Sequence, residues 1–255
     1  KHQKIWMIEP RRLATKAAAA RLAASLGEDI GARIGYAVRG EQKRSNRTQV
    51  EVITDGLFLR RLQSDPSLDG VGCVIFDEFH ERGRDADLAL ALLREARPLL
   101  NPDLAVMLMS ATLDLSDLRE RLPEATVLES PGRCYPVETH HQPPRPDESL
   151  SRQVLRAIEQ HAFEQPQGSG VLVFLPGLAE IERCRQTLTA APSLQNWKIQ
   201  ALHGQLPLQQ QSSALQRCDP NQDGSIILAS AIAESSLTID GVRLVIDSGL
   251  SRQLR

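Results

Sequence analysis

Two adjacent carboxylates, Asp77 and Glu78, directly follow the short apolar run 73–76. Such a run predicts a buried strand, and open α/β sheets bind ligands outside the carboxyl ends of their strands. An acid placed there can hold Mg²⁺, usually through water, because Mg²⁺ favours oxygen ligands and dehydrates reluctantly. The neighbouring acid can orient or deprotonate the water that attacks a phosphoryl group. Taken alone, however, the pair favours a plainer interpretation, a strand that ends in a solvated acidic turn.

Apolar runs and helical stretches alternate along the chain, and they would position these carboxylates. We expect a helix at 13–26, ended by Gly27 as a C-terminal cap, and another at 86–96. The runs that predict strands lie at 5–8, 73–76, 105–109, 170–175, 199–202, 226–229 and 244–246. This alternation predicts an α/β fold with parallel sheets flanked by helices.

A proline-rich stretch between Ser130 and Ser149 predicts a linker, because proline at this density breaks regular structure. The strand and helix pattern is similar on both sides of it, as expected for two related lobes. We therefore predict a boundary near Gly132, with one domain at 1–132 and a second at 133–255.

The overall composition is that of an ordinary globular protein, with 41% hydrophobic and 24% charged residues. The four cysteines form no CxxC pair, which favours thiols in a reducing compartment over a zinc site. No run reaches the roughly 18 apolar residues of a membrane span, and we expect a cytoplasmic protein. Residues 1–50 hold 11 Lys and Arg against 4 Asp and Glu. This basic end could attract phosphate backbones or form a solvated surface.

Segments in a fixed order across nearly the whole chain resemble the motifs of DEAH-box helicases. Asp77-Glu78-Phe79-His80 resembles their Walker B motif, with Phe in place of the usual Ala, and Glu81-Arg82 after it is most similar to the bacterial HrpB branch. The other resemblances are motif Ia at 9–14, Ib at 54–57, III at 110–112, IV at 174–177, the loop after it at 202–207, V at 229–239 and the strand end at 245–249. Each alone is weak, but their order is specific. The resemblance implies two tandem RecA-like lobes and an ATP-dependent RNA helicase with ATP and Mg²⁺ as cofactors.

The resemblance also implies roles for the residues around ATP. Asp77 would hold Mg²⁺ through water, Glu78 would polarise the hydrolytic water, and His80 would link the γ-phosphate site to motif III. The residues implied at the nucleotide are Asp77, Glu78, Ser110, Thr112 and Ser235. In plainer interpretations, His80 is a surface imidazole and 110–112 is a helix N-cap, since Ser and Thr are good caps.

A second implied set would contact nucleic acid. Arg11, Arg12, Thr54 and Gly56 would face an RNA backbone from the first lobe, and Gly177 and Thr238 from the second. Guanidinium and backbone N–H groups can bind phosphate oxygens. Such contacts do not distinguish RNA from DNA, because both have a phosphate backbone. The alternatives are a solvated helical turn at 11–12, a plain helix start at 54–56, a turn glycine at 177 and a strand-edge hydroxyl at 238. Ala231 replaces the usual motif V Asn, which puts one contact in doubt.

Two segments that the family uses are absent from the sequence. No G-x-x-x-x-G-K-[S/T] loop occurs, and no arginine-rich motif VI follows motif V. We therefore expect a piece of a longer protein, with the first lobe truncated at its N-terminus and hydrolysing little or no ATP by itself.

Two rival functions stay open on the sequence alone. The chain could be a nucleic-acid-binding remnant without catalysis, which a phosphate-binding loop encoded upstream would exclude. It could also be an ATPase that acts on protein or small molecules. The segments that resemble motifs Ia, Ib and V argue against this alternative, because those motifs serve nucleic acid rather than ATP. No obligate protein partner is evident in the sequence.

Overall fold

The computed structural model describes residues 3–111, 120–130, 135–204, 206, 210–211, 222–230 and 239–251. The chain divides into two compact units, unit 1 (Lys1–Arg133) and unit 2 (Cys134–Arg255). Thr112, Ser235 and Thr238 lie outside the described residues. Within the described part of the chain, no helix is long and apolar enough to cross a membrane.

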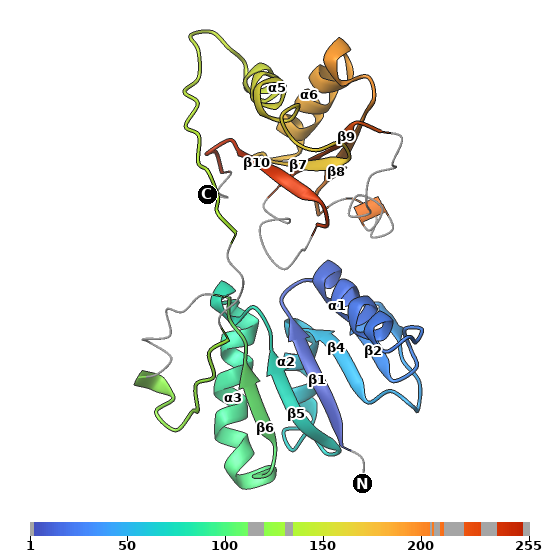
Figure 1. The fold of residues 1–255 in the computed structure, drawn as a ribbon. Coiled ribbons are helices and arrows are strands. Elements are labelled where there is room, and N and C mark those ends of the chain that lie inside the picture. The colour runs from blue at the N-terminus through green and yellow to red at the C-terminus, as the bar shows by residue number, and fades with distance from the viewer. Residues whose placement is uncertain are drawn as a thin grey trace. The chain divides into compact units, whose positions relative to one another are not determined.

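Unit 1 is built on one sheet with the strand order β3-β2-β4-β1-β5-β6 (Figure 1). All neighbouring strands pair in parallel except β2 and β3, which form an antiparallel hairpin. The strands are β1 (Lys4–Glu9), β2 (Ile34–Val38), β3 (Glu41–Lys43), β4 (Val50–Thr54), β5 (Val71–Phe76) and β6 (Ala105–Leu108). Its helices are α1 (Arg12–Ser25), α2 (Asp55–Ser64) and α3 (Arg84–Leu100), with a 3₁₀ turn η1 (Phe79–Glu81).

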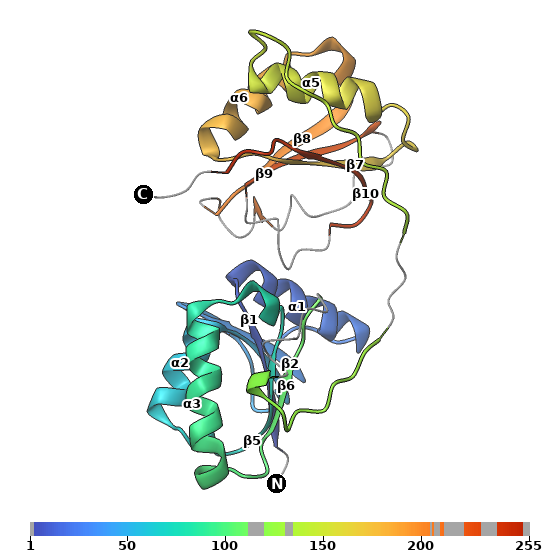
Figure 2. The ribbon, with the colours of Figure 1, turned by 90° about the vertical axis from the view of Figure 1, so that its left-hand side faces the viewer.

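The helices of unit 1 cover both faces of its sheet, with α1 on one face and α2 and α3 on the other (Figure 2). Small side chains let α1 approach closely, since Ala19 and Ala23 pack against Ile34 and Val52 of the sheet. On the opposite face, α2 and α3 bury a larger aromatic and aliphatic core around Phe58. These two layers hold the strands in place, so the ends of the strands are fixed relative to one another.

Unit 2 has a four-stranded, wholly parallel sheet in the order β10-β7-β9-β8. Helices α5 and α6 both lie on one face of this sheet (Figure 2) and bury Ile158, Ile181 and Leu188 against it. The elements are α5 (Leu150–His161), β7 (Ser169–Phe174), α6 (Leu178–Thr189), a 3₁₀ turn η2 (Pro192–Leu194), β8 (Trp197–Leu202), β9 (Gly224–Ala229) and β10 (Val242–Asp247). The predicted α/β fold with parallel sheets flanked by helices is thus confirmed, apart from the antiparallel β3.

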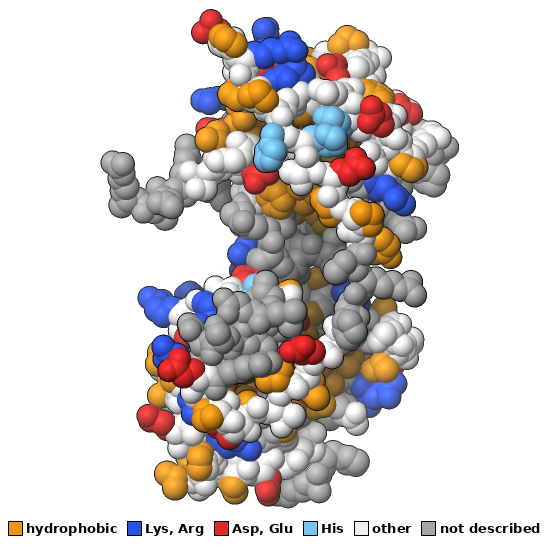
Figure 3. Space-filling view, turned by 60° about the vertical axis from the view of Figure 1, so that its left-hand side comes forward, with side chains coloured by type: hydrophobic (Ala, Val, Ile, Leu, Met, Phe, Trp, Pro, Cys, Tyr) orange, Lys and Arg blue, Asp and Glu red, His pale blue; other side chains and the backbone are white. Residues whose placement is uncertain are grey.

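The described part of the proline-rich stretch, 135–149, contains neither helix nor strand and is mostly exposed. It is attached to α5 by polar contacts, including the hydrogen bond from Gln142 to Gln160 (2.8 Å) and the ion pair of Arg156 with Glu148 (2.8 Å). The face drawn in Figure 3 carries acidic, basic and hydrophobic side chains on both units. The surface on this face is therefore mixed in character.

Candidate active site at the strand ends of unit 1

The carboxyl ends of the parallel strands of unit 1 bring the candidate residues to one edge of the sheet. Register places Glu9 of β1 beside Thr54 of β4, Ile8 beside Phe76 of β5, and Phe76 beside Leu108 of β6. The residues that follow these strands therefore emerge next to one another, as in other open α/β sheets. The segments 9–12, 54–56, 77–82 and 109–111 form this edge.

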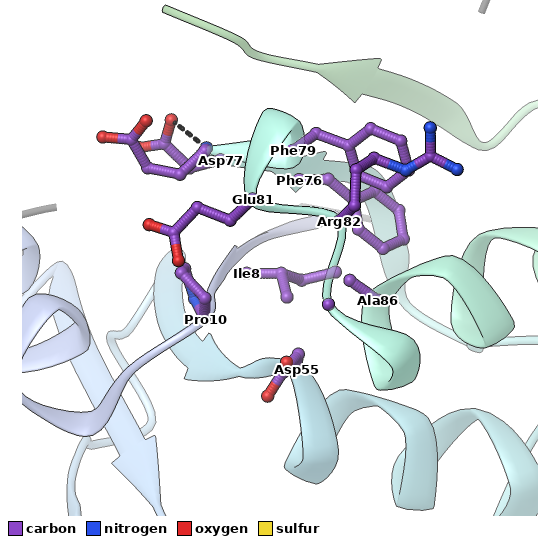
Figure 4. A pocket seen from close by; sticks show the side chains of 11 residues that line it. Ile8, Pro10, Asp55, Phe76, Asp77, Phe79, Glu81, Arg82 and Ala86 are labelled. Carbon is purple, nitrogen blue, oxygen red and sulfur yellow. Dashed lines mark hydrogen bonds between the residues drawn. The ribbon is translucent and has the colours of Figure 1, made fainter. Parts of the chain in front are cut away.

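A tight turn carries the two carboxylates after β5. The Asp77 backbone N–H donates to the Ile8 carbonyl (3.0 Å), and its carboxylate accepts the Glu78 N–H (2.9 Å; dashed in Figure 4). Glu78 has a φ of 49° and Arg82 a φ of 50°, both in the left-handed region. That conformation costs a residue with a Cβ roughly 1–2 kcal/mol, so the surrounding structure must hold the turn in place.

Packing around Phe79 supplies that support. The Phe79 N–H donates to the Met109 carbonyl (2.9 Å), and its ring is 3% exposed and lies edge-on to Phe76. Arg82 lies over the same ring and pairs with Asp87 of α3 (3.1 Å). The turn is therefore fixed from β5, β6 and α3 at once, and the direction of the Glu78 side chain follows from it.

Burial and neighbouring carboxylates raise the pKa of two acids at this edge, Glu78 and Glu9. Burial, then the Asp77 charge, raise the pKa of Glu78, while His80 opposes the shift. Burial is also the main cause at Glu9, whose pKa rises to about 8, assisted by the charge of Asp77 and a hydrogen bond to it. A hydrogen bond between two carboxyl groups needs one proton, and the raised pKa of Glu9 favours its protonated form. Glu9 is 3% exposed, and its Oε2 has no hydrogen-bond partner among the described residues.

A small pocket opens beside the turn. Figure 4 shows the Asp77 and Glu81 carboxylates together at one side of it, with the Arg82 guanidinium directed away from them. Its lining combines apolar strand residues with acids: Ile8, Pro10, Asp55, Phe76, Asp77, Glu78, Phe79, Glu81, Arg82, Gly83 and Ala86. Burial raises the pKa of Asp55 as well, and the nearby Asp85 and Glu81 add to this effect.

His80 joins the turn to the segment after β6. Its Nδ1 accepts the Ala111 backbone N–H at 3.4 Å and lies 3.5 Å from Glu78 Oε2. One nitrogen cannot accept from Ala111 and donate to Glu78 simultaneously, so the two contacts require different proton positions on the ring. Ser110 is exposed beside this contact. The structure thus brings His80 to Ala111, next to Ser110, whereas Thr112, the other residue predicted for this link, lies outside the described residues.

The predicted nucleic-acid residues of unit 1 lie at the same edge but in different surroundings. Arg11 is the N-cap residue of α1, and its Nη2 lies 3.5 Å from Glu81 Oε2. Arg12 opens the helix and is exposed. Its charge helps to lower the pKa of Glu41, after the larger effects of hydrogen bonds from Lys16 and Tyr36. Arg12 therefore lies near the β2–β3 hairpin.

Thr54 and Gly56 fit the plainer interpretation of a helix start, since α2 begins at Asp55 with Thr54 as its N-cap residue. The Gly56 N–H donates to the Asp55 carboxylate (2.7 Å). A Cβ on Gly56 would lie 3.1 Å from an oxygen of Asp85, so glycine makes room for that carboxylate. Gly177 lies in unit 2 as the N-cap residue of α6, with extended backbone that any residue can adopt.

Two residues of this edge were not predicted as site residues. Glu9 was noted only within its motif, although an acid directly after an apolar run is the same signal that singled out Asp77. Arg39 is exposed in the turn after β2, and Ala37 pairs with Ile53 near the end of β4. An Arg-Gly pair after the apolar run 34–38 was the available signal for this second residue.

Comparison with known proteins agrees with this geometry. The family model "DEAD/DEAH box helicase" matches residues 1–120, and "Helicase conserved C-terminal domain" matches residues 153–255. The chain is 42% identical over 252 residues to ATP-dependent RNA helicase HrpB of Escherichia coli (strain K12), which covers 99% of this chain and 31% of that protein. An ATP-dependent RNA helicase HrpA homolog of Haemophilus influenzae is 33% identical over 247 residues, covering 96% of this chain and 18% of that protein.

A solved structure shows the same likeness. The crystal structure of the Escherichia coli DEAH/RHA helicase HrpB matches with a TM-score of 0.86 and 41% identity, over 96% of this chain and 31% of that one. The chain thus spans about a third or less of the length of these relatives. The two family models between them match most of the chain, in the order that the motifs predicted, and the chain belongs to the DEAD/DEAH-box helicases, with HrpB-type members among its relatives.

Proposed function

We propose that the protein is an ATP-dependent RNA helicase that hydrolyses ATP at the Asp77–Glu78 turn. The observation that carries the proposal is the meeting of two kinds of residue at one sheet edge. A fixed turn presents two carboxylates there, and the adjacent loop after β1 presents Arg11 and Arg12. The relatives named above are RNA helicases, which supports the same function.

The donor set at the turn fits Mg²⁺ bound with a nucleotide. All candidate ligands are carboxylate oxygens, and a cation would relieve the Asp77 repulsion that, after burial, raises the pKa of Glu78. No group of three or more His, Cys, Asp or Glu side chains suited to a metal occurs among the described residues. Mg²⁺ at phosphate-binding sites is usually held through water and phosphates by one or two carboxylates. Bound Mg²⁺ would neutralise charge on the phosphates.

The chain's own residues would divide the remaining work. Asp77 would hold the ion through water, and the Glu78 carboxylate would accept a proton from the attacking water. His80 contacts both Glu78 and the Ala111 N–H, so it would couple a change at Glu78 to the 110–111 segment. We also propose Ser110, Thr112 and Ser235 as residues of the nucleotide site.

The RNA surface would follow the same edge of unit 1. Arg12 is the strongest candidate for a phosphate contact because it is exposed at the start of α1. Arg39 would extend that surface along the hairpin. Arg11, Thr54 and Gly56 complete the proposed set in unit 1, and Gly177 and Thr238 in unit 2. DNA would be accepted to the extent that contacts are to phosphates.

The two units would act as the two lobes of the motor, an ATP-binding lobe at 1–132 and a C-terminal lobe at 133–255. The exposed, irregular stretch 135–149 supports that division. Limited digestion with proteinase K, which does not need Arg or Lys, should cut first within 133–149 and leave two protected pieces. Early cuts inside the strand and helix blocks, with this stretch intact, would contradict the division.

We also propose a cytoplasmic location without an obligate protein partner. The described cysteines, Cys73 and Cys184, are free thiols, as a reducing compartment would leave them. Fractionation of cells and the mass of the purified protein in solution would test these two statements. A membrane-associated or periplasmic pool, or a fixed hetero-complex, would contradict them.

The decisive test is the ATPase activity of the complete protein with and without RNA. Mg²⁺-dependent hydrolysis that rises with added single-stranded RNA is expected, together with strand separation of an RNA duplex. A matched DNA strand distinguishes RNA preference from backbone binding. Nucleic-acid binding without any hydrolysis would favour the alternative of a binding remnant, and hydrolysis indifferent to nucleic acid would favour an ATPase of another kind.

A further inference from the structure

Arg11 and Glu81 connect the two halves of the candidate site. The guanidinium Nη2 of Arg11 lies 3.5 Å from Glu81 Oε2, and the side chains are 35% and 17% exposed. Arg11 belongs to the loop after β1, on the proposed RNA side, and Glu81 to the turn after β5 that carries Glu78. Because β1 and β5 are paired in parallel, this ion pair joins adjacent segments at the same sheet edge.

Glu81 is part of the same backbone turn as Glu78. It is the last residue of the 3₁₀ turn 79–81, and its N–H donates to the Glu78 carbonyl (2.9 Å). The left-handed residues Glu78 and Arg82 flank this turn, and Phe79 anchors it in the core. The backbone of Glu81 is therefore tied directly to that of Glu78.

Glu81 is also electrostatically coupled to the other carboxylates. Its charge is among the causes that raise the pKa of Glu78, Glu9 and Asp55, although burial is the largest cause at each. The Arg11 guanidinium compensates the Glu81 charge from the side of the loop. A phosphate that binds Arg11 would share this guanidinium, so Glu81 would lose part of its compensation.

We infer that the Arg11–Glu81 ion pair is a positioning link through which an RNA phosphate bound at the loop after β1 changes the setting of the Asp77–Glu78 turn. The inference rests on the proposed function and deepens it. Arg11 acts on hydrolysis through Glu81 rather than only holding RNA, whereas Arg12 serves binding. Such coupling is reciprocal in binding free energy, so a nucleotide at the turn also changes RNA affinity.

A double-mutant cycle on the complete protein tests the link. The variants are Arg11→Gln, Glu81→Gln and their combination, and the measured quantity is kcat with saturating single-stranded oligouridine divided by kcat without RNA. Each single change is expected to alter this ratio by at least about 3-fold. The two single effects should not multiply in the double variant, because both changes remove the same ion pair. Arg11→Lys keeps the charge and should restore part of the ratio.

The control is an ion pair of the same unit away from the turn. Glu28 pairs with Arg33 at 2.7 Å, and Glu28→Gln makes the same chemical change without touching the site. For Glu28→Gln, the ratio of kcat with RNA to kcat without RNA should stay at the wild-type value. Melting curves verify that each variant is folded. If Glu81→Gln does not fold, Glu81→Asp replaces it in the cycle, because it keeps the charge but shortens the side chain.

The outcomes separate the inference from the proposed function. Single effects that multiply in the double variant, or a Glu81→Gln ratio equal to wild type, would overturn the link while RNA-stimulated hydrolysis stands. A wild-type protein whose hydrolysis ignores RNA would instead contradict the proposed function itself. Non-multiplying effects with partial restoration by Arg11→Lys would establish the link.

Discussion

The sheets of the two units end differently at the carboxyl ends of their parallel strands. In unit 2, the residue after β7 continues the backbone ladder, as the Leu175 N–H donates to the Ala229 carbonyl (2.8 Å). Ser230 after β9 does the same toward Leu202 (3.2 Å). In unit 1, the Asp77 N–H also continues the ladder, to the Ile8 carbonyl (3.0 Å), but the next residue, Glu78, is left-handed and precedes a 3₁₀ turn. In the part of the chain that the structure describes, the turn after β5 therefore differs from the ends of β7 and β9 by the left-handed backbone of Glu78.

Electrostatics sharpen the contrast. The described carboxylate at the end of β10, Asp247, is satisfied locally by the N–H of Gly249 (2.9 Å). At the edge of unit 1, burial and then neighbouring carboxylates raise the pKa values of Glu9, Asp55 and Glu78, and Asp55 and Glu78 line a pocket. Carboxylates with perturbed pKa values in a concave place are typical of functional sites. Unit 1 is thus the side on which hydrolysis is expected.

The largest expected effect follows from removing the base at Glu78. Glu78→Gln keeps the shape of the side chain but cannot accept a proton, so hydrolysis should fall by on the order of 10² or more while ATP binding persists. Glu95→Gln, an exposed site on α3, is the matched control. Single-turnover hydrolysis and nucleotide titration measure the two quantities. Hydrolysis within a few-fold of wild type would remove Glu78 from the catalytic role.

The support of the turn can be broken at Phe79. Phe79→Ala introduces the Ala that is usual in the DEAH motif, but it leaves a cavity where the Phe79 side chain, 3% exposed, is packed. We expect a loss of about 3 kcal/mol in the free energy of unfolding of unit 1. In unit 2, Phe163 is 51% exposed and lies edge-on to Trp197, and Phe163→Ala should cost about 1 kcal/mol or less.

Urea unfolding can measure the two units separately, because the chain has two tryptophans, Trp6 in unit 1 and Trp197 in unit 2. Replacing one of them by Phe leaves fluorescence from the other unit alone. Equal losses for Phe79→Ala and Phe163→Ala would show that the turn is not held by its aromatic anchor.

Much of this fold could be predicted because apolar runs mark its buried strands. The central strand β4 escaped prediction because Glu51 interrupts its apolar pattern. That carboxylate is 1% exposed and paired with Arg61 (2.8 Å) and Arg44 (3.2 Å). Partners that are distant in sequence decide whether a charge can be buried, and a single strand does not reveal them.

The candidate site, like the fold, could be predicted only in part from the sequence. The identity and order of the acids at 77–78 were visible in the sequence, and so was the place of the turn after a strand. The left-handed backbone of Glu78 and the burial of Glu9 against Asp77 were not, since both depend on packing from β1, β6 and α3. The pairing of Arg11 with Glu81 likewise depends on which strands are neighbours.

An intermediate effect is expected from the buried acid of β1. The pKa of Glu9 is about 8 in the folded chain, against the ordinary value of 4.5 that applies when the chain is unfolded. Between these values the folded state binds more protons, so stability falls as pH rises toward 8. Glu9→Gln keeps a donor for Asp77 and does not titrate. Without Mg²⁺, its stability relative to wild type should therefore improve by roughly 2 kcal/mol between about pH 6 and about pH 9.

Chemical denaturation of both proteins at the two pH values checks this expectation. A difference that does not depend on pH would show that Glu9 keeps an ordinary pKa. A difference of opposite sign would show that the charged form is the stabilised one, which would mean that a cationic group compensates Glu9 in the folded chain.

The smallest expected effect concerns the exposed arginines at the same edge. Each phosphate contact that is lost should reduce the slope of log affinity against log salt by about 0.7 for single-stranded RNA. Arg12→Ala should therefore reduce it by about 0.7, and Arg39→Ala by a similar amount, with little change in stability. Arg97→Ala is the control, because Arg97 lies near the other end of α3, roughly 20 Å from its first residue at 1.5 Å per residue. RNA titrations at several salt concentrations measure the slopes. Equal slopes for all three variants and wild type would mean that Arg12 and Arg39 only solvate the surface, and the contrast between the two sheet edges would then concern hydrolysis alone.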